Sequence, residues 1–206
     1  MRKFLLLLPC LYAVVTTEGQ GKKKQTYIIA AISNAHTAKP CGSFSALFTK
    51  EMHPGLEVGA GINWSSKPKH DWFQELRFGY FYHRYVQHSL SFYTDFGYRY
   101  KLPLDMALEA RAGGGFTRVI VANEVFVDGM DEGKQYTKIV SGRSQVIVTT
   151  SLALNKVISK KSGSRIFFQY QQRVLTPFVQ SYIPLLPYNI AMIGANFPIR
   201  SNHQKN

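Results

Sequence analysis

Apolar and polar residues alternate along three long stretches of the chain, residues 72–86, 89–102 and 104–119. In the third stretch, for example, Leu108 belongs to the apolar set and its neighbour Glu109 belongs to the polar set. Successive side chains of a β-strand point to opposite faces, so a period of two predicts strands with one apolar and one polar face. The stretches are much longer than the roughly 5–6 residues of an average strand. Such length is typical of tilted strands in a barrel that crosses a bilayer.

The alternation extends, less sharply, to further segments on both sides. Together they predict eight strands, at residues 43–50, 55–64, 72–86, 89–102, 104–119, 144–155, 165–175 and 188–199. An even number of antiparallel strands is typical of single-chain bacterial barrels. The predicted fold is therefore all-β, a closed antiparallel eight-stranded transmembrane β-barrel. The apolar run at residues 27–32 falls outside this set, and a ninth strand, a periplasmic arm and an insert all remain open for it.

The connections between these strands predict two different ends of the barrel. If the N-terminus is periplasmic, the outer loops are residues 51–54, 87–88, 120–140 and 177–187, and the inner turns are residues 65–71, 103 and 158–164. Short inner turns and longer outer loops are usual for such barrels. The first two outer loops are unexpectedly tight.

Alternation alone does not say which face meets the surroundings. A soluble lipocalin-like barrel also alternates, with its apolar side chains inside. The polar face here holds Gly, Ser, Thr, Gln and Asn with balanced acids and arginines, which suits a crowded interior better than a water-facing surface rich in Lys and Glu. Arginine suits buried forked pairs with carboxylates. We therefore predict a charge network that fills the lumen, made of Glu57, Glu75, Arg77, Asp95, Arg99, Glu109, Arg111 and Arg173.

The first nineteen residues have the pattern of a secretory signal. A basic start is followed by the apolar run 4–15 and by small residues that predict cleavage after Gly19. The apolar run is shorter than the about 20 residues that a membrane-spanning helix needs. A lipoprotein signal with acylation at Cys10 is an alternative. The predicted organisation is residues 1–19 signal peptide, 20–42 N-terminal arm of uncertain structure, 43–199 β-barrel and 200–206 polar tail.

The formal net charge of +13 favours anionic partners. The basic residues are spread along the chain and no nucleic-acid motif is present, so we expect no nucleic-acid partner. Anionic headgroups would satisfy the same charge. Charged residues make up only 18% of the chain and aromatic residues 14%, which fits a membrane wall with aromatic belts at Trp64, Trp72, Tyr82, Tyr98, Tyr100 and Tyr170.

The sequence gives little sign of catalytic or metal chemistry. The six histidines have no metal-binding spacing, so no metal site and no cofactor are expected. A Ser–His pair on one strand face would need the two residues two apart, and neither His-x-Ser nor Ser-x-His occurs. His88 and Ser89 are direct neighbours, so they should diverge. We therefore name no catalytic residue, while a triad assembled across strands stays open.

Three segments, residues 43–55, 78–84 and 176–187, resemble stretches of small outer-membrane β-barrel proteins of Gram-negative bacteria. The resemblance covers residues 43–199. It implies a transmembrane barrel in the outer membrane, and it transfers no active-site residue because most members of that family are uncharacterised. The polar tail that follows Phe197 departs from the usual barrel ending, in which a terminal aromatic residue helps recognition during assembly.

The sequence as a whole predicts an integral outer-membrane protein with a structural, anchoring or loop-mediated binding role. Its expected partners are outer-membrane lipid and lipopolysaccharide, the barrel assembly machinery, and an extracellular or periplasmic protein. Two alternatives remain. One is a lipid-modifying outer-membrane enzyme of the lipid A deacylase or acyltransferase type, and the other is a secreted lipocalin-like carrier of apolar ligands.

Overall fold

Eight antiparallel strands close into a single barrel in the computed structural model, which describes residues 25–37, 52–83, 87–121, 125–126, 138–139, 142–177 and 185–199. The order around the barrel is β1-β10-β9-β8-β5-β4-β3-β2. The barrel strands are β1 (Thr26–Thr37), β2 (Pro54–Ser66), β3 (His70–His83), β4 (Gln87–Leu102), β5 (Met106–Val121), β8 (Gly142–Ser159), β9 (Ser164–Thr176) and β10 (Leu186–Pro198). The predicted fold class is confirmed.

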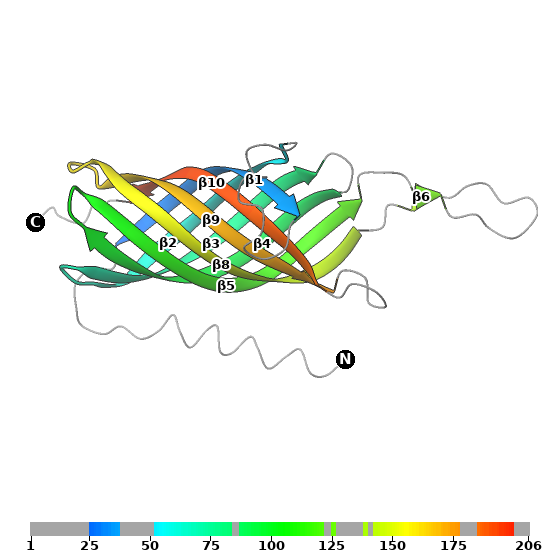
Figure 1. Cartoon of the computed structure of the whole chain (residues 1–206), viewed down its shortest axis with the longest axis horizontal. Helices are drawn as coiled ribbons and strands as arrows, with labels where there is room; N and C mark the ends of the chain where they lie inside the picture. Colours follow the sequence, from blue (N-terminus) through cyan, green and yellow to red (C-terminus); the bar gives the residue numbers. More distant parts are fainter. Residues whose placement is uncertain are drawn as a thin grey trace, which may run out of the picture.

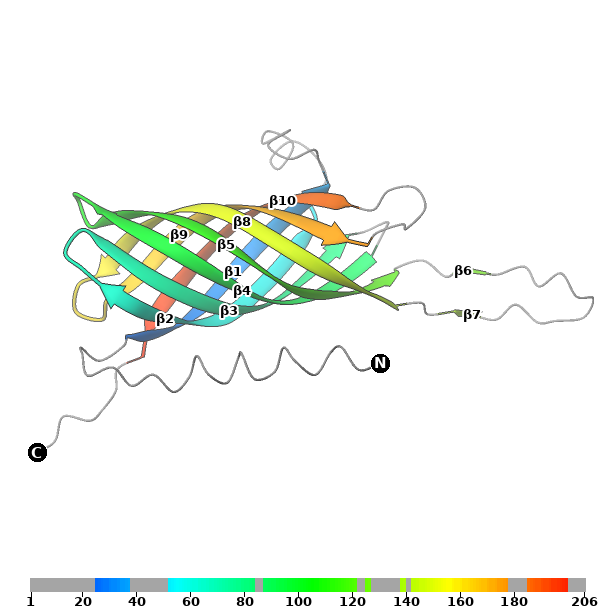
Figure 2. The ribbon, with the colours of Figure 1, turned by 90° about the horizontal axis from the view of Figure 1, so that it is seen from below.

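The strands run obliquely to the long axis of the barrel, and its two ends differ (Figure 1). At one end the strands are joined across residues 67–69, 103–105 and 160–163, and we call this the turn end. At the opposite end, the loop end, two short strands, β6 (Val125–Phe126) and β7 (Lys138–Ile139), pair with each other. Figure 2 shows this pair lying beyond the rim of the barrel.

The first strand of the barrel is β1, and the sequence-based boundaries at this point were wrong. Residues 27–37 pair with β10 and residues 26–34 pair with β2, so this segment closes the barrel rather than forming an arm or a ninth strand. The predicted strand 43–50 lies outside the described residues, as do the signal segment 1–19 and the tail 200–206. Because β1 ends at Thr37 and β2 begins at Pro54, the first connection at the loop end is longer than the predicted residues 51–54.

The polarity of the barrel is the reverse of that of a soluble lipocalin. Large apolar side chains on the outer face are exposed on every barrel strand, for example Leu76, Phe92 and Leu152. The charged side chains of the opposite parity, such as Glu75 and Arg77, are buried inside. A carrier of apolar ligands needs an apolar interior, so this placement excludes the lipocalin-like alternative.

The interior is divided into a charged part and an apolar part. The inward residues of β1 and β10, including Tyr27, Ile29, Ile190 and Met192, belong to one buried apolar cluster. Neither strand contains an Asp, Glu, Lys or Arg residue. The charged side chains come instead from β2, β3, β4, β5 and β9. This division explains why the last predicted strand alternated weakly, because apolar residues occupy both of its faces.

Within the described ranges, no helix has the length and apolar character needed to cross a membrane.

Candidate functional site in the barrel interior

Acidic and basic side chains alternate along a chain of ion pairs that runs through the interior of the barrel. We call this chain of contacts the charge ladder, and its members in order are Lys101, Asp71, Arg99, Glu109, Arg111, Glu75, Arg77, Glu57 and Arg173. Each acid bridges two bases. The nitrogen-to-oxygen distances include 2.7 Å for Arg77–Glu75, 3.0 Å for Arg173–Glu57 and 3.4 Å for Arg77–Glu57.

The ladder brings together seven of the eight residues predicted for the lumen, and it includes two that the prediction omitted. The eighth, Asp95, is buried but joins no ion pair among the described residues; its carboxylate accepts a hydrogen bond from Thr149. Asp71 had been placed in a turn, whereas it is an inward residue of β3 that binds Lys101 at 2.7 Å. Parity places side chains inside the barrel, but only the register of the strands determines which of them meet.

Aromatic rings cover the faces of the arginine side chains. The Arg99 guanidinium lies 4.7 Å from the centre of the Phe73 ring, and that of Arg173 lies 4.7 Å from the Tyr93 ring. Guanidinium edges can then bind carboxylates while their faces stack on rings, which is a favourable arrangement for a buried cation. Tyr93 also donates a hydrogen bond to Glu57 (2.6 Å). Only the parity of the aromatic residues along the strands could have indicated these ring contacts in advance.

Two glycines make room for these rings. A Cβ atom at Gly97 would lie 2.2 Å from the Phe73 ring, and one at Gly61 would lie 2.3 Å from the Tyr27 ring. Both distances are far below van der Waals contact, so the rings occupy space that any other residue would need. The expectation that glycines on the polar face serve a crowded interior agrees with these contacts.

The described residues show no arrangement of a serine with a histidine base at the positions that the sequence singled out. His88 lies on the outer face, where its Nδ1 is 2.8 Å from the Tyr80 hydroxyl. Ser89 and Ser91 are buried on the lumen side, and both hydroxyls contact Thr117. In the same described ranges, no three His, Cys, Asp or Glu side chains form a group that could hold a metal ion.

Aromatic side chains gather at the turn end on the outer face. Trp72 stacks on Phe96 with ring centres 5.3 Å apart, and it meets the edge of Tyr98 at 4.9 Å. Tyr80, Tyr82 and His88 form a second group near the loop end. Two separated groups at the two ends fit the predicted belts, whereas Tyr170 lies in the middle of β9.

Lysines surround the turn end, where Lys67, Lys69, Lys156, Lys160 and Lys161 are all exposed. The hydrogen bond that Lys160 donates to Asp105 (2.8 Å between Nζ and Oδ2) raises the pKa of this amine. Both partners are open to solvent, so the pair adds little stability. The rim as a whole is strongly basic and would attract anions.

No protein-family model matches the chain, and a search of curated proteins finds no match. Among solved structures, Neisserial surface protein A aligns with a TM-score of 0.56 at 8% identity, over 85% of this chain and 99% of that chain. The attachment invasion locus protein Ail of Yersinia pestis aligns with a TM-score of 0.47 at 11% identity, over 85% and 97% of the two chains. The outer membrane enzyme PagL aligns with a TM-score of 0.45 at 12% identity, over 85% and 99%. At these identities the similarity concerns the fold alone: the chain has the fold of small eight-stranded outer-membrane β-barrel proteins.

Proposed function

We propose that this protein is an integral barrel of the outer membrane whose lumen is closed by its own side chains and whose role is structural, anchoring or loop-mediated binding. The observation that carries the proposal is the reversed polarity, with an apolar wall outside and a charge ladder inside. Apolar side chains such as Phe92 and Leu152 are about half exposed in the folded chain, and only a lipid surround removes them from water. Insertion by the barrel assembly machinery and contact with outer-membrane lipid and lipopolysaccharide follow from the same wall.

Membrane extraction tests the location. We expect the protein to stay in the membrane pellet after a carbonate wash and to co-sediment with outer-membrane vesicles. Recovery of the folded protein in the soluble fraction would contradict the proposal. The signal segment is tested separately, because its removal should leave a mature chain that begins near Gln20.

A closed lumen is supported by the size of the barrel and by its filling. An eight-stranded barrel has an interior just wide enough for side chains, and here arginines and aromatic rings occupy it. In planar bilayers we expect the purified protein to give no steady ion conductance. The variant Arg77→Ala, which removes the cation shared by Glu75 and Glu57, should give at least intermittent conductance. Steady current through the unaltered protein would contradict the closed lumen.

The loop end is the part of the proposed protein that would meet an extracellular partner. The pair β6–β7 extends beyond the rim there, as Figure 2 shows. Deletion of residues 122–141 tests this role, because the amount of extracellular protein that whole cells bind should fall while the amount of folded barrel stays constant. An equal loss of folded barrel would point to a stabilising role for the segment instead.

A further inference from the structure

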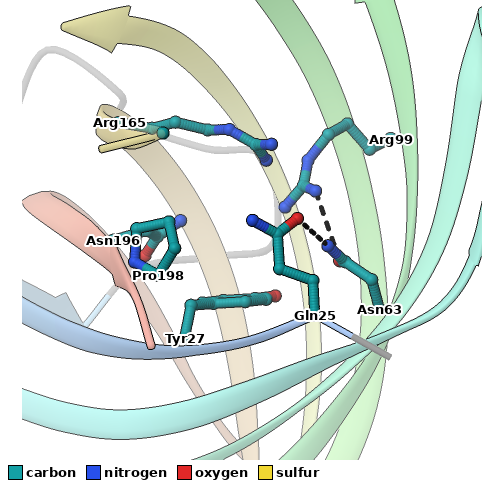
Figure 3. A pocket seen from close by; sticks show the side chains of 8 residues that line it. Gln25, Tyr27, Asn63, Arg99, Arg165, Asn196 and Pro198 are labelled. Carbon is teal, nitrogen blue, oxygen red and sulfur yellow. Dashed lines mark hydrogen bonds between the residues drawn. The ribbon is translucent and has the colours of Figure 1, made fainter. Parts of the chain in front are cut away.

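A polar hollow opens at the turn end of the lumen (Figure 3). The cavity itself is only about 10 Å³, room for one water-sized group, and with the adjoining space that is open to solvent it reaches about 220 Å³, so a larger ligand must enter from the mouth. The polar residues that line it are Gln25, Asn63, Arg99, Arg165 and Asn196, and Gly163 of the adjoining turn borders it. In Figure 3 the side chains of Arg99 and Arg165 point toward one another across this hollow. No acid belongs to its lining.

Several hydrogen-bond donors at the hollow have no partner among the described residues. Arg99 is 1% exposed, and its Nη2 atom has none, although its Nε binds Glu109 and its Nη1 reaches Asn63 at 3.4 Å. Asn196 is 3% exposed, and both its Nδ2 and its Oδ1 lack a partner. A buried donor without an acceptor is costly. Two donors at the hollow, Arg99 Nη2 and Asn196 Nδ2, are therefore left for an acceptor that the described residues do not supply.

The charge of the hollow favours an anion over a water molecule. Each acid of the charge ladder is shared between two bases, and Arg165 stands outside the ladder with no carboxylate within 4.0 Å in the described part of the chain. Arg165 and Asn196 are paired neighbours on β9 and β10, so their side chains lie together on the lumen face. Two guanidinium groups and an amide donor match the several oxygens of a phosphate group. The lysines of the turn-end rim would concentrate anions at its mouth.

We infer that the turn end of the lumen is a binding site for a phosphate group, held by Arg99, Arg165 and Asn196. The phosphate comes either from free inorganic phosphate or from the headgroup of a phospholipid at the rim. Arg165 is only partly buried, so its side chain can move toward solvent to admit the ligand. This site does not depend on the cellular location of the barrel.

The test is the effect of inorganic phosphate on the thermal unfolding of the full barrel in a non-ionic detergent, at constant ionic strength set with sodium chloride. Phosphate should raise the unfolding temperature of the unaltered protein in a saturable way. In Arg165→Gln the phosphate concentration that gives half the effect should rise about tenfold. The control Arg118→Gln makes the same charge change on the outer face near the loop end and should behave like the unaltered protein.

A second variant separates binding from a purely structural role. Asn196→Asp keeps the size of the side chain but places a carboxylate in the hollow next to Arg165. This variant should be more stable than the unaltered protein without phosphate, and phosphate should no longer stabilise it. Equal stabilisation of all variants by phosphate, or equal stabilisation by sodium chloride alone, would overturn the inference.

Lipid nanodiscs distinguish the two sources of the phosphate. If a headgroup supplies it, phosphatidylglycerol nanodiscs should raise the unfolding temperature over nanodiscs of a phosphate-free galactolipid in the unaltered protein but not in Asn196→Asp, and free phosphate should then add little. If free phosphate is the ligand, the two nanodiscs should give equal temperatures and added phosphate should raise both. A lack of response to phosphate in detergent and in both nanodiscs would overturn the site altogether.

Discussion

Apart from Lys101 at one end, each member of the charge ladder is buried among partners of the opposite sign. The loss of one member therefore leaves its neighbours as buried charges with fewer partners. Arg77 sits between Glu75 and Glu57, and the two carboxylates would be left without this shared cation if Arg77 were removed. Uncompensated buried charge is among the costliest defects in a folded protein. The contributions of the ladder members to stability should therefore depend on one another.

Replacing Arg77 tests this dependence. We expect Arg77→Met to lower the free energy of unfolding by about 3–5 kcal/mol. The double variant Arg77→Met with Glu75→Gln should recover part of this loss, because it removes one of the orphaned charges. Urea unfolding in lipid vesicles measures both. If the double variant lost as much free energy of unfolding as the two single variants added together, Arg77 and Glu75 would act independently.

The outward side chains should tolerate charge according to their depth. Leu152 is 59% exposed near the middle of β8, and arginine there should cost about 2–4 kcal/mol in a bilayer. The same replacement by arginine at Leu108, close to the turn end of β5, should lower the free energy of unfolding by only about 0–1 kcal/mol. The lumen-side control Ser151→Ala removes a buried hydroxyl that has no partner in the described part of the chain, and this change should be nearly neutral. Equal costs at the two leucines would contradict a bilayer around this wall.

At the scale of elements, β1 and β10 form the seam where the barrel closes, and they are the strands that sequence patterns identify least well. Tyr27 and Ile29 point inward while Ile28 and Ile32 point outward, so apolar residues occupy both faces. The contrast that reveals a half-polar strand is then absent. A short apolar run with no contrast is equally consistent with a buried strand or a helix segment.

A disulfide across the seam tests its register. Ala30 and Ala195 are direct partners on β1 and β10, and such neighbours lie within the distance range that a disulfide spans. In a chain that carries Cys41→Ser, we expect Ala30→Cys with Ala195→Cys to cross-link readily under mild oxidation. The control Ala30→Cys with Ala191→Cys should not cross-link, because the structure pairs Ala191 with Asn34 instead. A cross-link in the control alone would contradict the register.

The turn between β4 and β5 contains two consecutive residues in the left-handed region, Leu104 (φ 64°) and Asp105 (φ 58°). Hairpin turns of this type favour asparagine and glycine, because a left-handed backbone costs most other residues about 1–2 kcal/mol. The Leu104 side chain is 84% exposed, so little packing holds it there. We expect Leu104→Asn to raise the free energy of unfolding by up to about 1 kcal/mol, measured by urea unfolding. Leu102→Asn, at a position without a left-handed backbone, should not raise the free energy of unfolding.

For the molecule as a whole, alternation was enough to predict the fold class and the inward placement of residues such as Glu109 and Arg111. It could not identify the first strand, because the interior next to β1 is apolar. Nor could it assign partners, since Arg99 meets Glu109 and Asp71 through the register of three strands. The polar hollow at the turn end depends on side chains from five strands and from Gln25, and no spacing along the chain connects them.

The two ends of the barrel should lie on opposite sides of the membrane. In Cys41→Ser chains expressed in intact cells, a membrane-impermeant maleimide should label Met52→Cys, which is exposed at the loop end. Ser162→Cys in a turn of the opposite end should be labelled only after the outer membrane is permeabilised. Labelling of both in intact cells, or the reverse pattern, would contradict the proposed orientation.

The one-sided distribution of charge inside the barrel has a mechanical consequence. Because β1 and β10 contribute no ionisable acid or base to the ladder, separating these two strands would break backbone hydrogen bonds and apolar contacts but no ion pair. On the opposite side of the barrel, ion pairs between side chains of different strands hold the wall together. If the barrel opens laterally toward the lipid, or closes as the last step of its insertion, we expect the opening to lie between β1 and β10.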